Sequence, residues 1–299
     1  MRRASDAVCV SMIDRVRGHI TMLAGMPTAS EPPPAPEPLA VPVLDSHTHL
    51  DIVGGDPASA VAAAGAVGVD RLVQVGVDVA SSQWSARLAA EQPAVVATVA
   101  LHPNEAPALD KAGGLDEALR VIEGLATRDR VRGVGETGMD RYRTGDEGRA
   151  AQERSFRAHI AIAKATGRAL VIHDRDAHAD VLRILDDEGA PERVVLHCFS
   201  GDARFAADCV RRGYVLSFAG TVTFKNAEYL REAARVTPLD QILVETDAPF
   251  LTPMPYRGRP NGSYLIPLTV RSLAQTLGRD LDEVCAAISA TGERVFGPW

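Results

Sequence analysis

From Val41 onward, short apolar runs rich in β-branched residues alternate with longer segments whose apolar positions recur every three or four residues. The short runs predict buried strands, and the longer segments predict helices with one face on a core. Eight strands are expected, at Val41–Leu44, Arg71–Val77, Val95–Leu101, Val131–Gly135, Ala169–Ile172, Val194–Leu196, Tyr214–Phe218 and Ile242–Val244. The helical patterns between them include Ala58–Val67, Ser81–Glu91, Leu115–Arg128, Ala150–Ala165, Ala177–Glu188 and Ala203–Arg212. Near-continuous apolar strands separated by helices are typical of a parallel sheet that helices cover.

Eight such units over about 250 residues predict an α/β fold, a single-domain (β/α)8 TIM barrel over residues 41–299. A doubly wound sheet is the alternative. The sequence contains no Walker A motif, which would have supported that alternative.

The first 40 residues differ from the rest of the chain. The stretch Glu31–Pro38 is rich in proline, which neither continues a helix nor pairs in a sheet. We therefore expect residues 1–40 to form a disordered N-terminal extension, or to reflect a start codon placed too early; a short interaction arm is the alternative.

Composition narrows the class of protein. The 299 residues carry 46% hydrophobic side chains but no apolar run of about 18 residues, so we expect no transmembrane helix and no membrane partner. The net charge of −7 means that binding of a polyanion would need a local basic patch or bound metal. The four cysteines are far apart in sequence, which favours free thiols and a cytoplasmic location.

Polar side chains stand where predicted strands end. Five of the eight histidines occupy such positions, namely His47, His49, His102, His173 and His197. Two carboxylates, Glu136 and Asp247, follow the fourth and the eighth strand. The carboxyl ends of barrel strands meet at one mouth, so we expect these side chains to converge.

The residue types at this mouth favour metal binding. His47 and His49 are two positions apart and point to one side of their strand, as does Asp45. The expected metal ligands are His47, His49, Glu136, His173, His197 and Asp247. Six ligands favour two divalent ions about 3.5–4 Å apart, bridged by Glu136, with Asp247 also accepting a proton from water. Ligand chemistry does not choose between Mg, Mn and Zn.

A single histidine at a strand end is more often structural than a ligand, but five histidines and two carboxylates in equivalent positions are hard to explain in that way. The other histidines do not share the position. His159 and His178 lie within helical patterns and His19 lies in the extension, so we expect all three at the surface.

Six stretches of the chain resemble, in order, the motifs of the TatD family of metal-dependent deoxyribonucleases. They are Asp45–Asp51, Gly133–Gly138, Val171–His173, Leu196–Gly201, Ser217–Lys225 and Glu245–Pro253. The resemblance implies an amidohydrolase-type TIM barrel and a two-metal phosphodiesterase, often a 3′-to-5′ exonuclease on DNA, with all six ligand positions filled. One departure follows the eighth strand, where the family usually reads Arg-Gly-x-x-Asn-Glu-Pro and this chain has Gly262-Ser263 after Asn261.

This resemblance gives the hypothesis for catalysis. Asp247, Glu136 and His102 are the expected catalytic residues, and the substrate is DNA or RNA bound by a monomer. His102 and Arg175 would contact the scissile phosphate, while Lys225 and Arg257 would guide the strand from the rim.

Two alternatives remain at this level. The first is an amidohydrolase that cleaves a C–N bond or another kind of ester bond. Cyclic amidases of this kind often have a carboxylated lysine at the end of strand four, where this chain has Glu136. Deaminases usually have a glutamate soon after the strand-five histidine, where this chain has Asp174-Arg175-Asp176. A non-catalytic scaffold would be expected to have lost a ligand, and none is lost.

Overall fold

A computed structural model describes residues 31–299. Its eight strands are β1 (Val43–Thr48), β2 (Val69–Val75), β3 (Val95–Val99), β4 (Val131–Asp140), β5 (Ala169–Arg175), β6 (Val194–Leu196), β7 (Val215–Phe218) and β8 (Ile242–Val244). Each overlaps the strand expected from its apolar run, because strands buried on both faces are apolar almost throughout.

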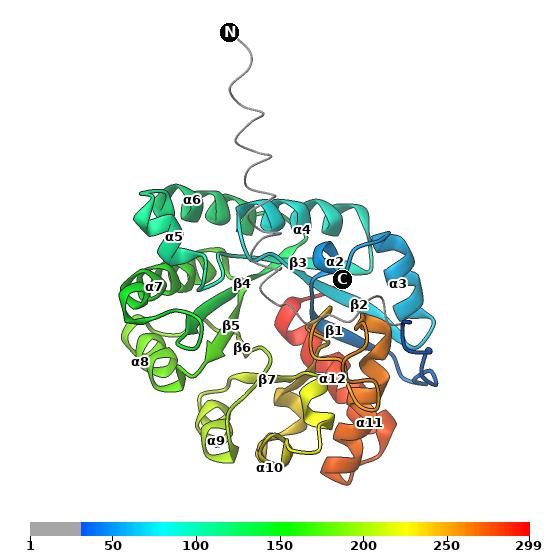
Figure 1. The fold of residues 1–299 in the computed structure, drawn as a ribbon. Helices are drawn as coiled ribbons and strands as arrows, with labels where there is room; N and C mark the ends of the chain where they lie inside the picture. Colours follow the sequence, from blue (N-terminus) through cyan, green and yellow to red (C-terminus); the bar gives the residue numbers. More distant parts are fainter. Residues whose placement is uncertain (1–30) are drawn as a thin grey trace. The chain divides into compact units, whose positions relative to one another are not determined.

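The strands form one parallel sheet in the order β1 to β8 (Figure 1). The sheet closes at its carboxyl end, where a parallel bridge joins Thr48 to Ala248. Two backbone hydrogen bonds reinforce this closure, from His49 N to Ala248 O and from Asp247 N to His47 O, at 3.0 and 2.9 Å. The (β/α)8 barrel is therefore confirmed, and the doubly wound alternative is wrong.

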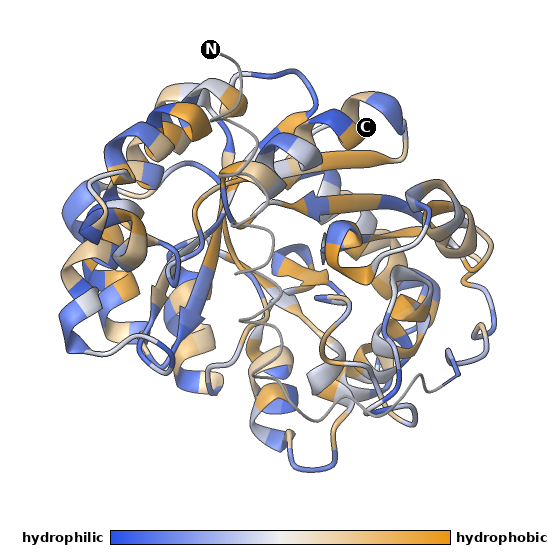
Figure 2. Ribbon diagram, turned by 45° about the horizontal axis from the view of Figure 1, so that its top comes forward, coloured by the Kyte–Doolittle hydropathy of each residue, from blue (hydrophilic) through white to orange (hydrophobic). Residues whose placement is uncertain are grey.

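Helices lie outside the sheet. They are α2 (Leu50–Val53), α3 (Pro57–Gly65), α4 (Val79–Glu91), α5 (Ala106–Lys111), α6 (Leu115–Ala126), α7 (Arg149–Thr166), α8 (His178–Glu188), α9 (Ala203–Arg211), α10 (Glu228–Val236), α11 (Ile266–Leu277) and α12 (Leu281–Phe296). Several helices are two-toned in hydropathy, and the strands combine apolar stretches with polar ones (Figure 2). The core thus lies inside the barrel and between its strands and helices, which leaves the strand ends free to carry polar groups.

The last part of the Pro-rich stretch lies against the barrel. Leu39 is buried, and its N–H donates to Val67 O at 3.0 Å. The hydroxyl of Tyr264 donates to Pro33 O at 2.9 Å, and Arg271 donates to Pro38 O at 3.2 Å. Residues 1–30, which make up most of the expected extension and include His19, lie outside the described residues. Within residues 31–299, no helix is long and apolar enough to cross a membrane.

Candidate metal centre

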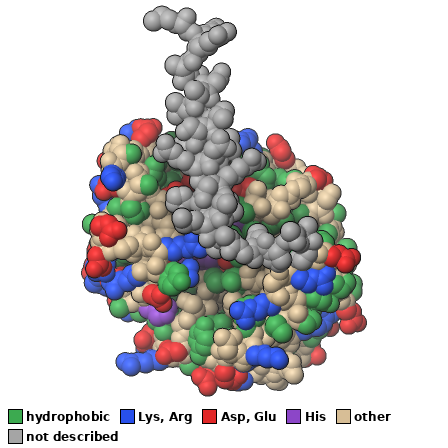
Figure 3. All heavy atoms as spheres, viewed as in Figure 1, with side chains coloured by type: hydrophobic (Ala, Val, Ile, Leu, Met, Phe, Trp, Pro, Cys, Tyr) green, Lys and Arg blue, Asp and Glu red, His purple; other side chains and the backbone are tan. Residues whose placement is uncertain are grey.

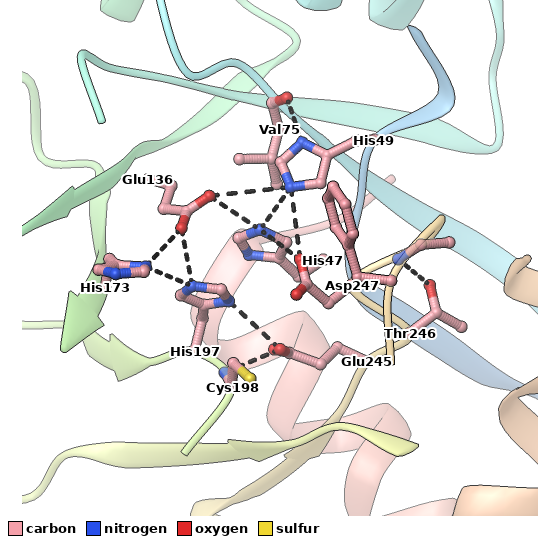
Figure 4. A network of polar contacts seen from close by, with 12 residues as sticks. His47, His49, Val75, Glu136, His173, His197, Cys198, Glu245, Thr246 and Asp247 are labelled. Atoms are coloured by element: carbon pink, nitrogen blue, oxygen red, sulfur yellow. Dashed lines mark hydrogen bonds and ion pairs between the residues drawn. The ribbon is translucent and has the colours of Figure 1, made fainter. Parts of the chain in front are cut away.

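Six side chains from five strand ends meet at the mouth of the barrel (Figure 4). His47 lies on β1 and His49 directly after it, Glu136 on β4, His173 on β5, His197 after β6, and Asp247 after β8. These are the six residues that the sequence predicted to be metal ligands. Strand ends place them side by side although as many as 200 residues separate them in the chain, counting from His47 to Asp247.

Glu136 stands at the centre, and its two carboxylate oxygens face different partners. Its Oε1 atom lies 2.8 Å from His173 Nδ1 and 3.0 Å from His197 Nε2. Its Oε2 atom lies 3.4 Å from His47 Nε2 and 3.8 Å from His49 Nε2. One carboxylate therefore joins two groups of imidazole nitrogens.

Asp247 completes the group around Oε2. Its Oδ1 atom lies 3.5 Å from His49 Nε2 and 3.8 Å from His47 Nε2, and the two Nε2 atoms are 3.2 Å apart. A tetrahedral site with metal–nitrogen distances of about 2.0–2.1 Å separates its ligand atoms by about 3.3 Å. The observed spacing fits a bound divalent cation, as does the convergence of nitrogen and oxygen donors on each side of Glu136.

The far nitrogens of three histidines are held by other acceptors. His49 Nδ1 lies 3.2 Å from Val75 O, and His197 Nδ1 lies 3.2 Å from Glu245 Oε1. A carbonyl or carboxylate oxygen accepts only from N–H, so in the neutral ring each contact places the proton on Nδ1 and leaves the Nε2 lone pair facing the cluster. On His173 the roles are reversed, because Nε2 lies 3.3 Å from Asp140 Oδ2 and Nδ1 faces Glu136.

His102 differs from these ligands. Its Nδ1 atom accepts the N–H of Asn104 at 3.1 Å, so in the neutral ring the proton sits on Nε2. This Nε2–H points to Glu136 Oε1 at 3.3 Å. Burial lowers the pKa of His102, although the charge of Glu136 raises it, so the ring is a neutral hydrogen-bond donor.

The cluster is strongly charged. Burial opposes the charge of Glu136, but His197 and His102 outweigh burial and hold its pKa well below the usual range. Burial likewise disfavours protonation of His49, but Asp247 and Glu136 raise its pKa to about 9. Carboxylates that hold protons on neighbouring imidazoles form a site that attracts positive charge, and a divalent ion can take the place of those protons.

The loop after β8 is braced from two sides. Asp45 Oδ2 accepts the hydroxyl of Thr246 at 2.6 Å, and its Oδ1 accepts the Thr246 N–H at 2.9 Å. Asn261 Nδ2 donates to Thr246 O at 3.0 Å, so the asparagine that this loop shares with the family still acts on the site without the Glu-Pro that usually follows. Asp247 has φ +51°, a left-handed conformation that needs such support in a non-glycine residue.

Asp45 therefore departs from expectation. Its position on β1 suggested a side chain beside His47 and His49, but its carboxylate is turned to Thr246 instead. Burial raises its pKa to about 6, against the hydrogen bonds that lower it. A period-two pattern fixes the face of a strand but not the direction in which a short side chain turns at the end of the strand.

The expectation for His159 was wrong. We expected it at the surface, but it lies on the buried face of α7 and its side chain is fully buried. Its Nε2 atom accepts the N–H of Leu101 at 3.1 Å. His178 is partly exposed and pairs with Asp174 Oδ2 through Nδ1 at 2.7 Å. Of the expected rim residues, Arg175 ends β5, and Lys225 and Arg257 lie in the segments that follow β7 and β8. Arg175 lies over the Tyr142 ring and Arg257 over the Phe224 ring.

Sequence reasoning missed Asp140 and Glu245, which bind the far sides of His173 and His197. Glu245 lies two positions before Asp247, and Asp140 four positions after Glu136. An acidic residue that close to a predicted ligand is a signal that could have marked both as members of the site, although not which histidine each one contacts.

The geometry agrees with comparison to known proteins. The sequence profile of the TatD related DNase family matches residues 44–297. This chain belongs to that family. It is 45% identical over 263 residues to the metal-dependent hydrolase TatD of Mycobacterium tuberculosis, a match that covers 85% of this chain and 98% of the relative.

Two further relatives widen the comparison. The 3′-5′ ssDNA/RNA exonuclease TatD of Citrobacter rodentium is 32% identical over 244 residues, which cover 79% of this chain and 90% of the relative. The crystal structure of the TatD homologue YjjV of Escherichia coli superposes with a TM-score of 0.78 at 24% identity, covering 86% of this chain and 98% of YjjV, which supports the fold. The chain is thus a metal-dependent hydrolase of the TatD family.

Proposed function

We propose that this TatD-family hydrolase cleaves phosphodiester bonds in nucleic acid with two divalent ions, as a 3′-to-5′ exonuclease on DNA. The observation that carries the proposal is the division of Glu136, with one oxygen toward His173 and His197 and the other toward His47 and His49. Two ion sites that share one carboxylate suit an in-line displacement at phosphorus. The Citrobacter rodentium relative, a 3′-5′ exonuclease on single-stranded DNA and RNA by name, supports the same chemistry.

When bound, the two ions would supply Lewis acidity, which polarises the phosphodiester and lowers the pKa of water. His47, His49 and Asp247 would hold one ion and His173 and His197 the other, with Glu136 between them. Burial works against the charge of Asp247, but contacts with His49 and the charges of His47 and His197 lower its pKa. Asp247 is therefore ionised and able to accept the proton of the attacking water.

The neutral histidine at the edge of the cluster binds the substrate. His102 presents its Nε2–H beside Glu136, where it would donate a hydrogen bond to a non-bridging phosphate oxygen. Arg175 would neutralise the same phosphate from the β5 end. Lys225 and Arg257, both exposed, would guide the strand over the rim, and basic side chains stand among acidic and apolar ones on the face drawn in Figure 3.

The decisive experiment is digestion of 3′-labelled and 5′-labelled single-stranded DNA with Mg²⁺ or Mn²⁺, with EDTA as control. We expect mononucleotides to be released from the 3′ end in the presence of metal, and turnover to be lost in Asp247→Asn. Asp129→Asn, at an exposed position away from the cluster, is the matched control and should keep full activity. Absence of cleavage by the metal-loaded protein would redirect the search to amides and other esters.

A further inference from the structure

An exposed tyrosine stands on the rim beside the metal cluster. Tyr142 follows β4 and is 67% exposed, more than any other large hydrophobic side chain in residues 31–299. The guanidinium carbon of Arg175 lies 3.9 Å from the centroid of its ring. One face of the ring is thus covered by a cation from β5, and the other face is available to a ligand.

The backbone that carries this ring is fixed to the metal site. Asp140 Oδ1 accepts the N–H groups of Tyr142 and Arg143 at 2.9 and 2.8 Å. The second oxygen of the same carboxylate lies 3.3 Å from Nε2 of His173. One buried side chain therefore ties a predicted metal ligand to the backbone of Tyr142.

A second set of contacts holds the loop to the neighbouring strand. The N–H of Arg141 donates to Arg175 O at 2.9 Å, which extends the pairing of β4 with β5 by one residue. Asn104 Nδ2 donates to Asp140 Oδ2 at 3.0 Å, and Asn104 Oδ1 accepts the hydroxyl of Thr144 at 2.9 Å. An exposed aromatic ring on a loop braced at both ends is preorganised, so little conformational entropy opposes binding to it.

We propose that Tyr142 is a stacking platform for an unpaired nucleobase next to the scissile phosphate, and that it directs the site to single-stranded nucleic acid. This inference rests on the proposed function and adds to it a residue that would select unpaired substrate. Aromatic rings stack on any base that is not already stacked in a duplex, and a nearby basic group holds the phosphate of the same nucleotide.

The residues around Tyr142 supply that basic group. Arg175 covers the inner face of the ring, and the exposed Arg143 follows Tyr142 in the chain. Arg141 is already paired with Asp180. A base on the open face of Tyr142 would have its phosphate between Arg175 and the cluster, because His173 and Arg175 are two residues apart on β5.

The test compares Tyr142→Ala and Tyr142→Phe on two oligonucleotides, one with all its bases and one with abasic nucleotides at its 3′ end. For the oligonucleotide with bases, Tyr142→Ala should raise KM about tenfold, the size expected for loss of one base–aromatic stack. It should leave kcat and the KM for the abasic oligonucleotide within about twofold of wild type. Tyr142→Phe keeps the ring and should behave as wild type on both.

Binding provides a readout that does not depend on turnover. Single-stranded DNA with 2-aminopurine near its 3′ end is titrated into the Asp247→Asn protein with Mn²⁺, and stacking on Tyr142 should quench the fluorescence. The quench should disappear when Tyr142→Ala is added to this background and should remain with Tyr142→Phe.

The outcomes separate the two proposals. Quenching that depends on Tyr142, without cleavage by wild type, would uphold the stacking platform and reject the nuclease. Cleavage with an equal effect of Tyr142→Ala on both oligonucleotides, or with unchanged quenching, would overturn the platform and leave the nuclease intact; the ring would then only shield Arg175. No binding of DNA by wild type would overturn both.

Discussion

Two kinds of buried histidine occur in this barrel and differ in what they face. His159 accepts a backbone N–H on Nε2, and its Nδ1–H donates to Ser155 O at 2.7 Å. His197 faces a carboxylate on each side, Glu136 at 3.0 Å and Glu245 at 3.2 Å. Burial lowers the pKa of His159 to about 4, whereas the two carboxylates outweigh burial and raise the pKa of His197 well above its ordinary value.

The comparison shows that burial alone does not identify a metal ligand. Both nitrogens of His159 are hydrogen-bonded to neutral backbone groups, so the ring has a structural role. In the cluster, imidazole nitrogens and carboxylate oxygens converge on shared points, and a divalent cation can take the place of the protons between them. His159 nevertheless supports the site, since its partner Leu101 precedes His102, and Thr137, which lies 3.0 Å from Nδ1, follows Glu136.

The largest expected effect comes from Glu136→Gln. Glutamine keeps the size of the side chain but removes the charge and one of the two oxygens, so it cannot bridge two ions. We expect turnover to fall about a thousandfold and bound metal to fall toward one ion or none. DNA hydrolysis and metal analysis of the purified protein measure this, with Glu123→Gln, exposed on α6, as control.

Full metal content and near-normal activity in Glu136→Gln would remove the basis for a shared carboxylate. Retention of one ion with loss of turnover would show that one of the two groups binds an ion without the shared carboxylate.

His159→Ala should act on stability instead. The substitution leaves a cavity and a buried Leu101 N–H without an acceptor, which together cost about 3 kcal/mol of the free energy of unfolding. Urea denaturation of the metal-free protein measures the loss. His178→Ala, at a partly exposed position of α8, should cost less than about 1 kcal/mol. A His159→Ala protein as stable as wild type would contradict the structural role.

The pH dependence of stability sharpens the same contrast. His159 is neutral in the folded protein and its pKa is about 4, below the ordinary value of 6.5, so the unfolded chain binds the extra proton as pH falls. The contribution of His159 is therefore complete above about pH 6.5 and shrinks toward pH 4. The loss of this contribution between pH 7 and pH 5 amounts to about 2 kcal/mol of the free energy of unfolding.

The measurement is the difference in unfolding free energy between wild type and His159→Gln at several pH values, both without metal. The carboxylates and histidines of the cluster are common to both proteins and cancel to first order. The excess in unfolding free energy of wild type over His159→Gln should become smaller as the pH falls. A constant difference would mean that His159 does not titrate in this range.

Most of the fold could be predicted from the sequence because each strand includes an apolar run bounded by polar residues. The convergence of the histidines could also be predicted from the sequence, since a parallel barrel directs all carboxyl ends of its strands to one mouth. The direction of individual side chains was beyond that reasoning. Asp45 turned to Thr246, and His159 sits on a helix whose apolar face is itself buried.

The partners of the ligands were equally hard to predict. His197 and Glu245 are 48 positions apart, and His173 and Asp140 are 33 apart. Nothing local in the sequence says that an acidic residue will meet a particular imidazole. Only the register of the strands around the barrel sets those pairs, and the register follows from packing throughout the barrel.

The smallest expected effect tests one of these partners. Glu245 Oε1 accepts His197 Nδ1–H and the N–H of Cys198 at 2.7 Å, so its charge strengthens the Nε2 lone pair that faces the cluster. Glu245→Gln can keep both hydrogen bonds through its amide oxygen but loses the charge. We expect metal affinity to fall about tenfold, with full turnover restored at saturating metal. Titration of activity against Mn²⁺ measures both quantities, and Glu232→Gln, exposed on α10, is the matched control. If activity stayed low at saturating metal, Glu245 would act on the reaction itself; if the affinity did not change, the charge behind His197 would be irrelevant, and the contrast with His159 would rest on Glu136 alone.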